Sequence, residues 1–202
     1  MRIAIDLDGV TYEFERTARY MLRELRGYAD VKELQTESTE WDYIPNHIGS
    51  DDWRWLWDEG IELGLFRYGH VSTGAIVGLR ALLKAKHDLL VVTHRPRKAV
   101  PDTLAWLSYI NIPFSEVHIL SDGQRKSSVA ADLIIDDKWE NVREWAQRDR
   151  HAILFDRPWN QDHYDTDQIT RAFGWGKVVD AVQDVGLRLT QGVSKRDAAG
   201  YR

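Results

Sequence analysis

Short apolar runs alternate along this chain with longer segments whose apolar residues recur at helical spacing. Short runs bounded by polar residues or glycine predict buried strands, and recurrence every three to four residues predicts helices packed on one face. Strands that alternate with helices favour a parallel sheet with right-handed crossovers. The predicted strands are 2–7, 88–93, 116–120, 132–135 and 151–155, and the predicted helices are 11–26, 50–63, 101–110, 139–148, 175–186 and one beginning at Ser72.

The spacing of the first two predicted strands indicates an insertion. They are separated by about eighty residues, far more than one crossover helix needs. We therefore expect residues 1–10 and 73–189 to form a three-layer, Rossmann-like α/β core with a parallel sheet. Residues 11–72 are predicted to form a small inserted helical cap, and the polar segment 190–202 a frayed, flexible tail.

Composition excludes several classes of protein. A length of 202 residues with 43% hydrophobic and 29% charged residues is typical of a folded soluble domain, and a net charge of −5 argues against a stable nucleic-acid partner. The absence of cysteine excludes disulfides, thiolate metal sites and a cysteine nucleophile. No apolar run approaches the ~20 residues of a membrane span, and the N-terminal apolar stretch is too short for a signal peptide. We expect a cytoplasmic protein without a membrane partner.

Several polar residues fall where predicted strands end or just beyond. Ligands bind beyond the carboxyl ends of strands in open parallel sheets, so these residues are expected to converge on one crevice. Packed carboxylates raise one another's pKa unless a cation lies among them, and a donor set of oxygen atoms favours a hard cation, of which Mg²⁺ fits best. The residues are Asp6, Asp8, Thr93, Lys126, Asp136 and Asp137.

That set of side chains suits phosphoryl transfer. Thr93 supplies a hydroxyl donor and Lys126 a positive charge for the oxygens of a phosphoryl group. An aspartate can attack phosphorus and form an aspartyl-phosphate, and the remaining catalysis is alignment and charge neutralisation. The pattern predicts a magnesium-dependent phosphatase with a phosphomonoester substrate.

The same residues carry a family resemblance. Segment 6–11 (Asp-Leu-Asp-Gly-Val-Thr) resembles the first motif of the haloacid dehalogenase superfamily, and Thr93, Lys126 and the pair 136–137 are similar to its second, third and fourth motifs, in order. The segment from Lys126 to Asp137, with the lysine ten positions before the first acid, more closely resembles the 5'(3')-deoxyribonucleotidase family. Phe14 and segment 154–160 (Leu-Phe-Asp-Arg-Pro-Trp-Asn) are also similar to that family, but the rest of the predicted cap is not.

The resemblance implies a role for each motif. Asp6 would be the nucleophile and a metal ligand, and Asp8 would protonate the leaving oxygen, activate water and bind the metal through its backbone carbonyl. Thr93 and Lys126 would hold the phosphate. One of the two acids 136–137 would complete the metal shell, with Asp137 favoured as the direct ligand and Asp136 close behind.

One motif departs from the family pattern. His94 and Arg95 follow Thr93, where the family has a small residue and then proline. We expect Arg95 to add a contact to substrate phosphate, and His94 to narrow the phosphate-binding site or to change which substrates fit.

Each of these signals also has a purely structural interpretation. An Asp-x-Asp-Gly sequence is common in loops, and the pair 136–137 is placed to cap the following helix. Lys126 alone would be a solvated surface lysine, and Thr93 an ordinary strand residue. The order and strand context of all four motifs together favour an active site.

The predicted cap is rich in aromatic residues. Helical spacing places Trp53 and Trp57 on one face and Trp55 elsewhere, so one face is expected to pack the cap core. Trp41 or Trp55 is a candidate to stack on a nucleobase. Phe14 is a candidate for the same contact, although a core position is the commoner role for a phenylalanine.

We therefore predict hydrolysis of a nucleoside monophosphate, with the cap closing over the site. The alternatives are another small phosphomonoester, a nucleic-acid end, or a phosphate-binding protein without catalysis, which the complete set of motifs disfavours. Base, sugar and 5' versus 3' preference depend on cap geometry. The family resemblance is also compatible with a homodimer.

Overall fold

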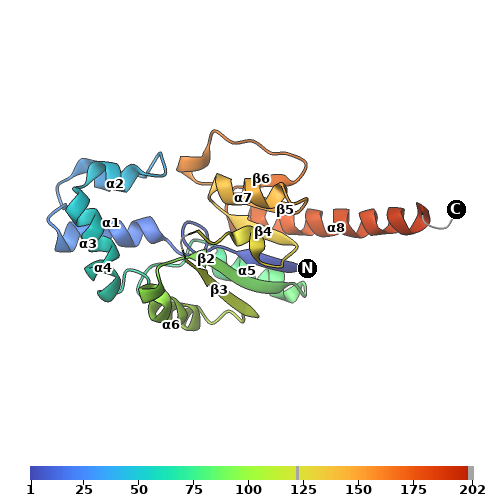
Figure 1. The fold of residues 1–202 in the computed structure, drawn as a ribbon, viewed down its shortest axis with the longest axis horizontal. Coiled ribbons are helices and arrows are strands. Elements are labelled where there is room, and N and C mark those ends of the chain that lie inside the picture. The colour runs from blue at the N-terminus through green and yellow to red at the C-terminus, as the bar shows by residue number, and fades with distance from the viewer. Residues whose placement is uncertain (122, 200–202) are drawn as a thin grey trace.

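The fold is built around a six-stranded sheet, in a computed structural model that describes residues 1–121 and 123–199. All neighbouring strands are parallel, in the order β3-β2-β1-β4-β5-β6 (Figure 1). The predicted α/β fold with a parallel sheet is confirmed. The strands are β1 Arg2–Ile5, β2 Asp88–His94, β3 Glu116–Leu120, β4 Leu133–Asp136, β5 His151–Phe155 and β6 Ile169–Ala172.

Helices cover both faces of the sheet, and the side chains of β1 alternate between the two. Ile3 and Ile5 pack into one apolar cluster with residues of α5, α6 and α8, whereas Ala4 packs into a second with residues of α7. Because both faces are buried, the central strands are almost continuously apolar, which is why the sequence pattern identified them. The helices are α5 Ala75–Lys84, α6 Val100–Ile110, α7 Trp139–Ala146 and α8 Trp175–Ala199.

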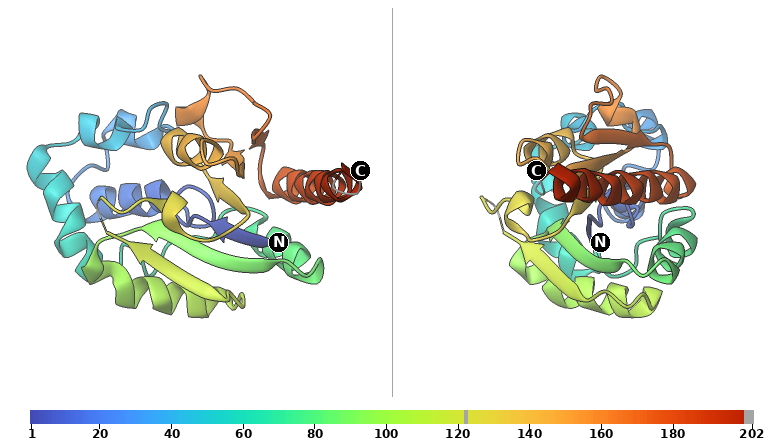
Figure 2. Two further views of the ribbon diagram at one scale, coloured as in Figure 1. Left: turned by 45° about the vertical axis from the view of Figure 1, so that its right-hand side comes forward. Right: turned by 90° about the vertical axis from the view of Figure 1, so that its right-hand side faces the viewer.

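Between β1 and β2 the chain forms a separate group of helices. These lie at one end of the molecule, opposite the C-terminal end of α8 (Figures 1 and 2). They pack around an apolar cluster of their own that includes Leu22, Ile44, Leu56 and Phe66. We call residues 14–66 the α1–α4 segment. Its helices are α1 Phe14–Leu25, α2 Tyr43–His47, α3 Ser50–Trp57 and α4 Glu59–Glu62.

Several boundaries differ from those predicted. The first helix starts at Phe14 rather than residue 11, because the residues after β1 form a tight loop. The helix predicted over 50–63 is divided at Asp58, whose backbone (φ −105°, ψ −85°) is not helical. β6 was not predicted, since its four residues contain neither an apolar run nor a clear alternation.

The last helix also differs from prediction. α8 continues past residue 186 to Ala199, so it extends into the segment predicted to be a frayed tail. Residues 200–202 of that predicted tail lie outside the described residues. Within the part of the chain that the structure describes, no helix is long and apolar enough to cross a membrane.

Candidate active site

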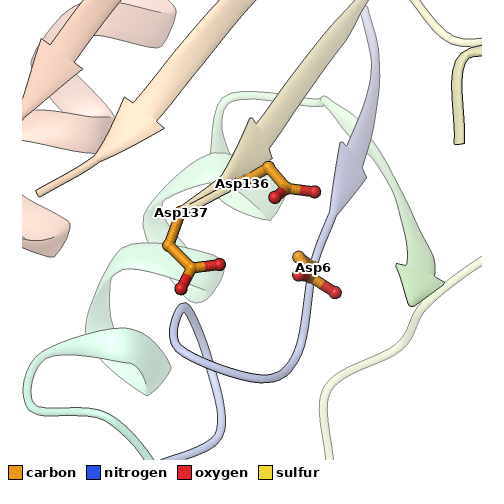
Figure 3. A group of neighbouring side chains, drawn as sticks. All are labelled: Asp6, Asp136 and Asp137. Atoms are coloured by element: carbon orange, nitrogen blue, oxygen red, sulfur yellow. The ribbon is translucent and has the colours of Figure 1, made fainter. Parts of the chain in front are cut away.

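Three carboxylates meet beyond the ends of two neighbouring strands. Asp6 follows β1, and Asp136 ends β4, which pairs with β1 through Ile5 and Ile135. Asp137 is the next residue, and one oxygen from each of the three acids lies within 4.8 Å of the others (Figure 3). All three are buried, so the group is a candidate metal site of the kind predicted from the sequence.

Lys126 lies between two of these acids. It begins a 3-10 turn, Lys126–Ser128, after β3, and its Nζ is 2.7 Å from Asp6 Oδ2 and 2.7 Å from Asp136 Oδ2. Burial alone lowers the pKa of the lysine, but the charges of Asp136 and Asp6 outweigh burial and raise that pKa above its usual value. Lys126 is therefore a permanent buried cation.

The two adjacent acids have different surroundings. Asp136 accepts hydrogen bonds from Lys126, from the backbone N–H of Lys138 at 2.9 Å and from Asn141 at 3.0 and 3.1 Å. Burial raises the pKa of the Asp136 carboxyl, and Lys126 offsets part of that rise. Both oxygens of Asp136 thus accept hydrogen bonds from protein donors.

Asp137 keeps one oxygen free of protein donors. Its Oδ2 accepts a hydrogen bond from Trp159 Nε1 at 3.1 Å, but its buried Oδ1 has no partner among the residues that the structure describes. Burial raises the pKa of Asp137 well above its usual value, and the charges of Asp136 and Asp6 raise it further. An unpartnered buried carboxylate oxygen is costly, and a cation bound among the three acids would relieve that cost.

Thr93 provides a second unpartnered group at the same edge. It lies near the end of β2, on the other side of β1 from β4. Within the described part of the chain, its buried Oγ1 has no hydrogen-bond partner. Asp6 accepts a hydrogen bond from the backbone N–H of Leu7 through Oδ1 and contacts Lys126 through Oδ2. The core thus presents a carboxylate, an ammonium and an unsatisfied hydroxyl in one place.

The loop after β1 folds back against Asp137. The Leu7 carbonyl accepts the backbone N–H groups of Val10, Thr11 and Tyr12, which makes the turn tight. Gly9 has φ +78°, and a Cβ at this position would lie 2.1 Å from Asp137 Oδ2. Glycine is therefore required there by both backbone conformation and space.

The two residues that depart from the family pattern differ in position. Arg95 is buried and outside the lining of the cavity; its guanidinium pairs with Asp8. His94 is exposed and lines the cavity, and its Nε2 is 2.7 Å from the carbonyl oxygen of Gln124, so that nitrogen carries the proton and donates it to this carbonyl. The phosphate contact predicted for Arg95 is not what this geometry provides.

A cavity of about 840 Å³ lies between the acidic cluster and the α1–α4 segment. Its lining includes residues of all four motifs, and its other residues include aromatic, basic and acidic side chains. The core motifs contribute Asp6, Asp8, Thr93, Lys126 and Asp137, and the α1–α4 segment contributes Phe14, Arg16, Arg19, Arg23, Trp41, Trp53 and Trp57 among others.

Residues 1–189 match the model of one protein family, described as 5' nucleotidase, deoxy (pyrimidine), cytosolic type C protein. The chain belongs to this family. It is a phosphoric monoester hydrolase of the 5'-nucleotidase type with the haloacid dehalogenase fold, as the sequence motifs predicted. No match was found among curated proteins.

Solved structures agree with the fold. A haloacid dehalogenase-like hydrolase from Streptococcus pneumoniae is 14% identical, with a TM-score of 0.64 over 90% of this chain and 97% of that one. A haloacid dehalogenase-like hydrolase from Xanthomonas campestris is 13% identical, with a TM-score of 0.60 over 95% and 98%. CbbY from Rhodobacter sphaeroides, solved in complex with phosphate, is 12% identical, with a TM-score of 0.53 over 86% and 94%.

The nucleotidase has an aromatic wall opposite its acidic cluster. Phe14 stacks on Trp57 with ring centroids 5.6 Å apart, and Trp57 meets Trp53 edge to face at 5.5 Å. All three line the cavity, so Phe14 belongs both to the packing of the segment and to the cavity wall. Trp53 and Trp57 share a helix face, as their spacing predicted.

The two tryptophans predicted to contact substrate differ in position. Trp41 lines the cavity, is 51% exposed and meets Trp159 of the core edge to face at 6.3 Å. Trp55 does not line the cavity; its indole donates to Glu59, and Arg26 lies 5.1 Å from its ring centroid. The structure therefore supports the prediction for Trp41 and not the one for Trp55.

The segment after β5 supports the site, and sequence reasoning assigned it no role. Arg157 Nε donates to the Gly9 carbonyl at 2.6 Å, Trp159 donates to Asp137, and Asn160 donates to the Asp137 carbonyl at 2.8 Å. The segment holds both the loop after β1 and the acid with the free oxygen. Its position directly after a predicted strand was a signal that it lies at the same edge.

Proposed function

We propose that this protein is a magnesium-dependent nucleotidase that hydrolyses a nucleoside monophosphate through an aspartyl-phosphate on Asp6. The observation that carries the proposal is the buried cluster of Asp6, Lys126 and Asp137 beneath a cavity with an aromatic wall. The proposed nucleophile and the cation that neutralises the phosphate then lie on one side of the cavity. The aromatic surface for a planar base lies on the other side.

The donor set fits Mg²⁺. Asp6 and Asp137 would hold the ion, together with the backbone carbonyl of Asp8 that the family resemblance implies. The unpartnered Oδ1 of Asp137 supports its choice over Asp136, whose oxygens already accept hydrogen bonds from protein donors. When bound, the ion supplies positive charge that neutralises the carboxylates and polarises the phosphoryl group.

The chemistry proceeds in two displacements. An Asp6 oxygen attacks phosphorus, the bond to the leaving oxygen breaks, and that oxygen takes a proton from the carboxyl group of Asp8. Water then attacks the aspartyl-phosphate, gives a proton to Asp8 and releases inorganic phosphate as the bond to Asp6 breaks. Thr93 Oγ1 donates to a non-bridging oxygen, and Lys126 balances the negative charge on Asp6 and the phosphoryl group.

The choice of substrate rests on the cavity. Its volume of about 840 Å³ accommodates a nucleotide, and Phe14, Trp41 and Trp57 offer flat rings for a base. A small phosphate-ester substrate also agrees with the phosphate bound in the Rhodobacter sphaeroides structure. We further propose that residues 11–72 act as the cap that excludes water, with Trp41 and Trp159 in contact at its edge.

Phosphatase assays of the purified protein with and without Mg²⁺ test the proposal. Phosphate release is measured from ribo- and deoxyribonucleoside 5'- and 3'-monophosphates and from sugar phosphates. We expect turnover of at least one nucleotide in Mg²⁺, loss of turnover with a chelator, and no turnover by Asp6→Asn. Turnover of sugar phosphates alone would reject the substrate class, and full activity of Asp6→Asn would reject the mechanism.

A further inference from the structure

Asp8, the proposed proton donor and acceptor, is held by a buried arginine. Arg95 Nη2 donates to Asp8 Oδ1 at 2.6 Å, and Arg95 Nε donates to Asp8 Oδ2 at 2.9 Å. These two parallel hydrogen bonds fix the plane and direction of the carboxylate. Asp8 itself is 25% exposed, so without this partner its side chain would have room to rotate towards solvent.

Arg95 has no comparable freedom. Its side chain has no exposed surface, and its Nη1 donates to Thr103 Oγ1 at 3.0 Å. Its guanidinium carbon lies 4.7 Å from the ring centroid of Tyr12 and 4.4 Å from that of Phe66. The two aromatic rings and the hydrogen bond to Thr103 therefore set the position of the guanidinium, and the guanidinium sets that of Asp8.

The backbone explains why Arg95 reaches Asp8. The N–H of Arg95 donates to the Leu120 carbonyl at 3.3 Å, and Leu120 pairs with His94, the last residue of β2. This hydrogen bond fixes the backbone of Arg95 at the end of β2, two residues after Thr93. Arg95 is thereby placed beside the phosphate-binding motif without lining the cavity.

We infer that Arg95 is a positioning residue that aligns Asp8 for proton transfer to the leaving oxygen. This inference rests on the proposed function. Arg95 contacts neither the cavity nor the acidic cluster, so its action on the reaction passes through Asp8. A lysine has a single ammonium group and cannot make the same two parallel hydrogen bonds, so it would leave Asp8 free to turn.

The leaving group provides the test. A nucleoside leaves as an alkoxide that needs a proton, whereas p-nitrophenolate is stable without one. The quantity to compare is kcat/KM, which covers the reaction up to departure of the alcohol and excludes hydrolysis of the aspartyl-phosphate. In Arg95→Gln and Arg95→Lys we expect kcat/KM for the nucleotide to fall about 100-fold and that for p-nitrophenyl phosphate only a few-fold.

Two controls separate positioning from folding. Arg97→Gln, at an exposed arginine two residues on, is expected to leave both values unchanged. Adding Arg95→Gln to Asp8→Asn is expected to cause no further loss, because the group being aligned is already absent. Arg95→Lys, which retains the charge, serves if Arg95→Gln does not fold.

An equal loss with both substrates in every folded Arg95 variant would overturn the inference and assign Arg95 a structural role only. The inference would also be overturned if adding Arg95→Gln to Asp8→Asn lowered kcat/KM by as much as Arg95→Gln lowers it in the wild type. Neither result affects the proposed function. Wild-type protein that releases phosphate from neither substrate would instead overturn the proposed function, and the inference with it.

Discussion

Gly9 and Asp137 are packed so closely that a Cβ at residue 9 would lie 2.1 Å from Asp137 Oδ2. The two residues come from different strand ends, β1 and β4, which are neighbours in the sheet. Their contact holds the loop that carries Asp8 against the acid with a free oxygen. The contact therefore couples the position of the proposed proton donor to that of a proposed metal ligand.

Gly9→Ala is expected to damage both stability and activity. The positive φ alone costs about 1–2 kcal/mol, and the clash with Asp137 adds about 1–3 kcal/mol. Gly27→Ala is a matched control, because Gly27 has the same φ of +78° but no atom of the described residues lies within 4 Å of an added Cβ. Urea unfolding and phosphatase assays of both variants measure the difference. Equal destabilisation with normal activity would contradict the role given to the contact.

Asp137→Asn is expected to stabilise the protein in the presence of a chelator. The pKa of Asp137 is raised in the fold, so between its unfolded and folded values the folded protein binds more protons than the unfolded chain. The free energy of unfolding therefore falls as pH rises through that window, by up to about 1.4 kcal/mol per pH unit. Asparagine removes this loss, so the advantage of the variant should grow with pH.

Unfolding midpoints measured in chelator between pH 4 and 8 test this expectation, with the exposed Asp30→Asn as a control. Added Mg²⁺ should stabilise the wild type and not Asp137→Asn. A variant that is less stable than the wild type at every pH without metal would contradict the idea that the unpartnered carboxylate is a cost.

Lys126→Met is expected to be strongly destabilising. It removes the cation between Asp6 and Asp136, so both buried carboxylates lose their counter-ion. This loss is expected to lower the free energy of unfolding by about 3–5 kcal/mol. Lys98→Met removes an exposed ion pair with Asp58 and should cost less than about 1 kcal/mol. Chemical denaturation compares the two. Similar losses would mean that Lys126 does not compensate the acids.

Trp41→Ala is expected to lower kcat/KM for a nucleotide about tenfold, since stacking of one base contributes about 1–3 kcal/mol. p-Nitrophenyl phosphate should be affected far less, because its phosphate remains bound by Thr93 and Lys126. Trp55→Ala is the control, since Trp55 lies outside the cavity. A loss in the Trp55 variant equal to that in the Trp41 variant would show that the aromatic wall is misassigned.

The sequence by itself determined the parallel sheet and the meeting of Asp6 with the pair 136–137. Apolar runs reveal buried strands directly, and the carboxyl ends of parallel strands share one edge, so residues far apart in the chain are placed together by topology alone. The family resemblance added the role of each motif. β6 was missed because Ile169–Ala172 has no pattern of its own and exists through pairing with β5.

Only the tertiary structure decided which partner each side chain found. Arg95 lies 87 positions from Asp8 in sequence, and Trp159 lies 22 from Asp137. Local periodicity shows the direction in which a side chain leaves the backbone, but not which residues of another segment it contacts. For that reason Arg95 was expected to contact the phosphate and Trp55 was one candidate to stack on a base, whereas in the structure Arg95 pairs with Asp8 and Trp55 lies outside the cavity.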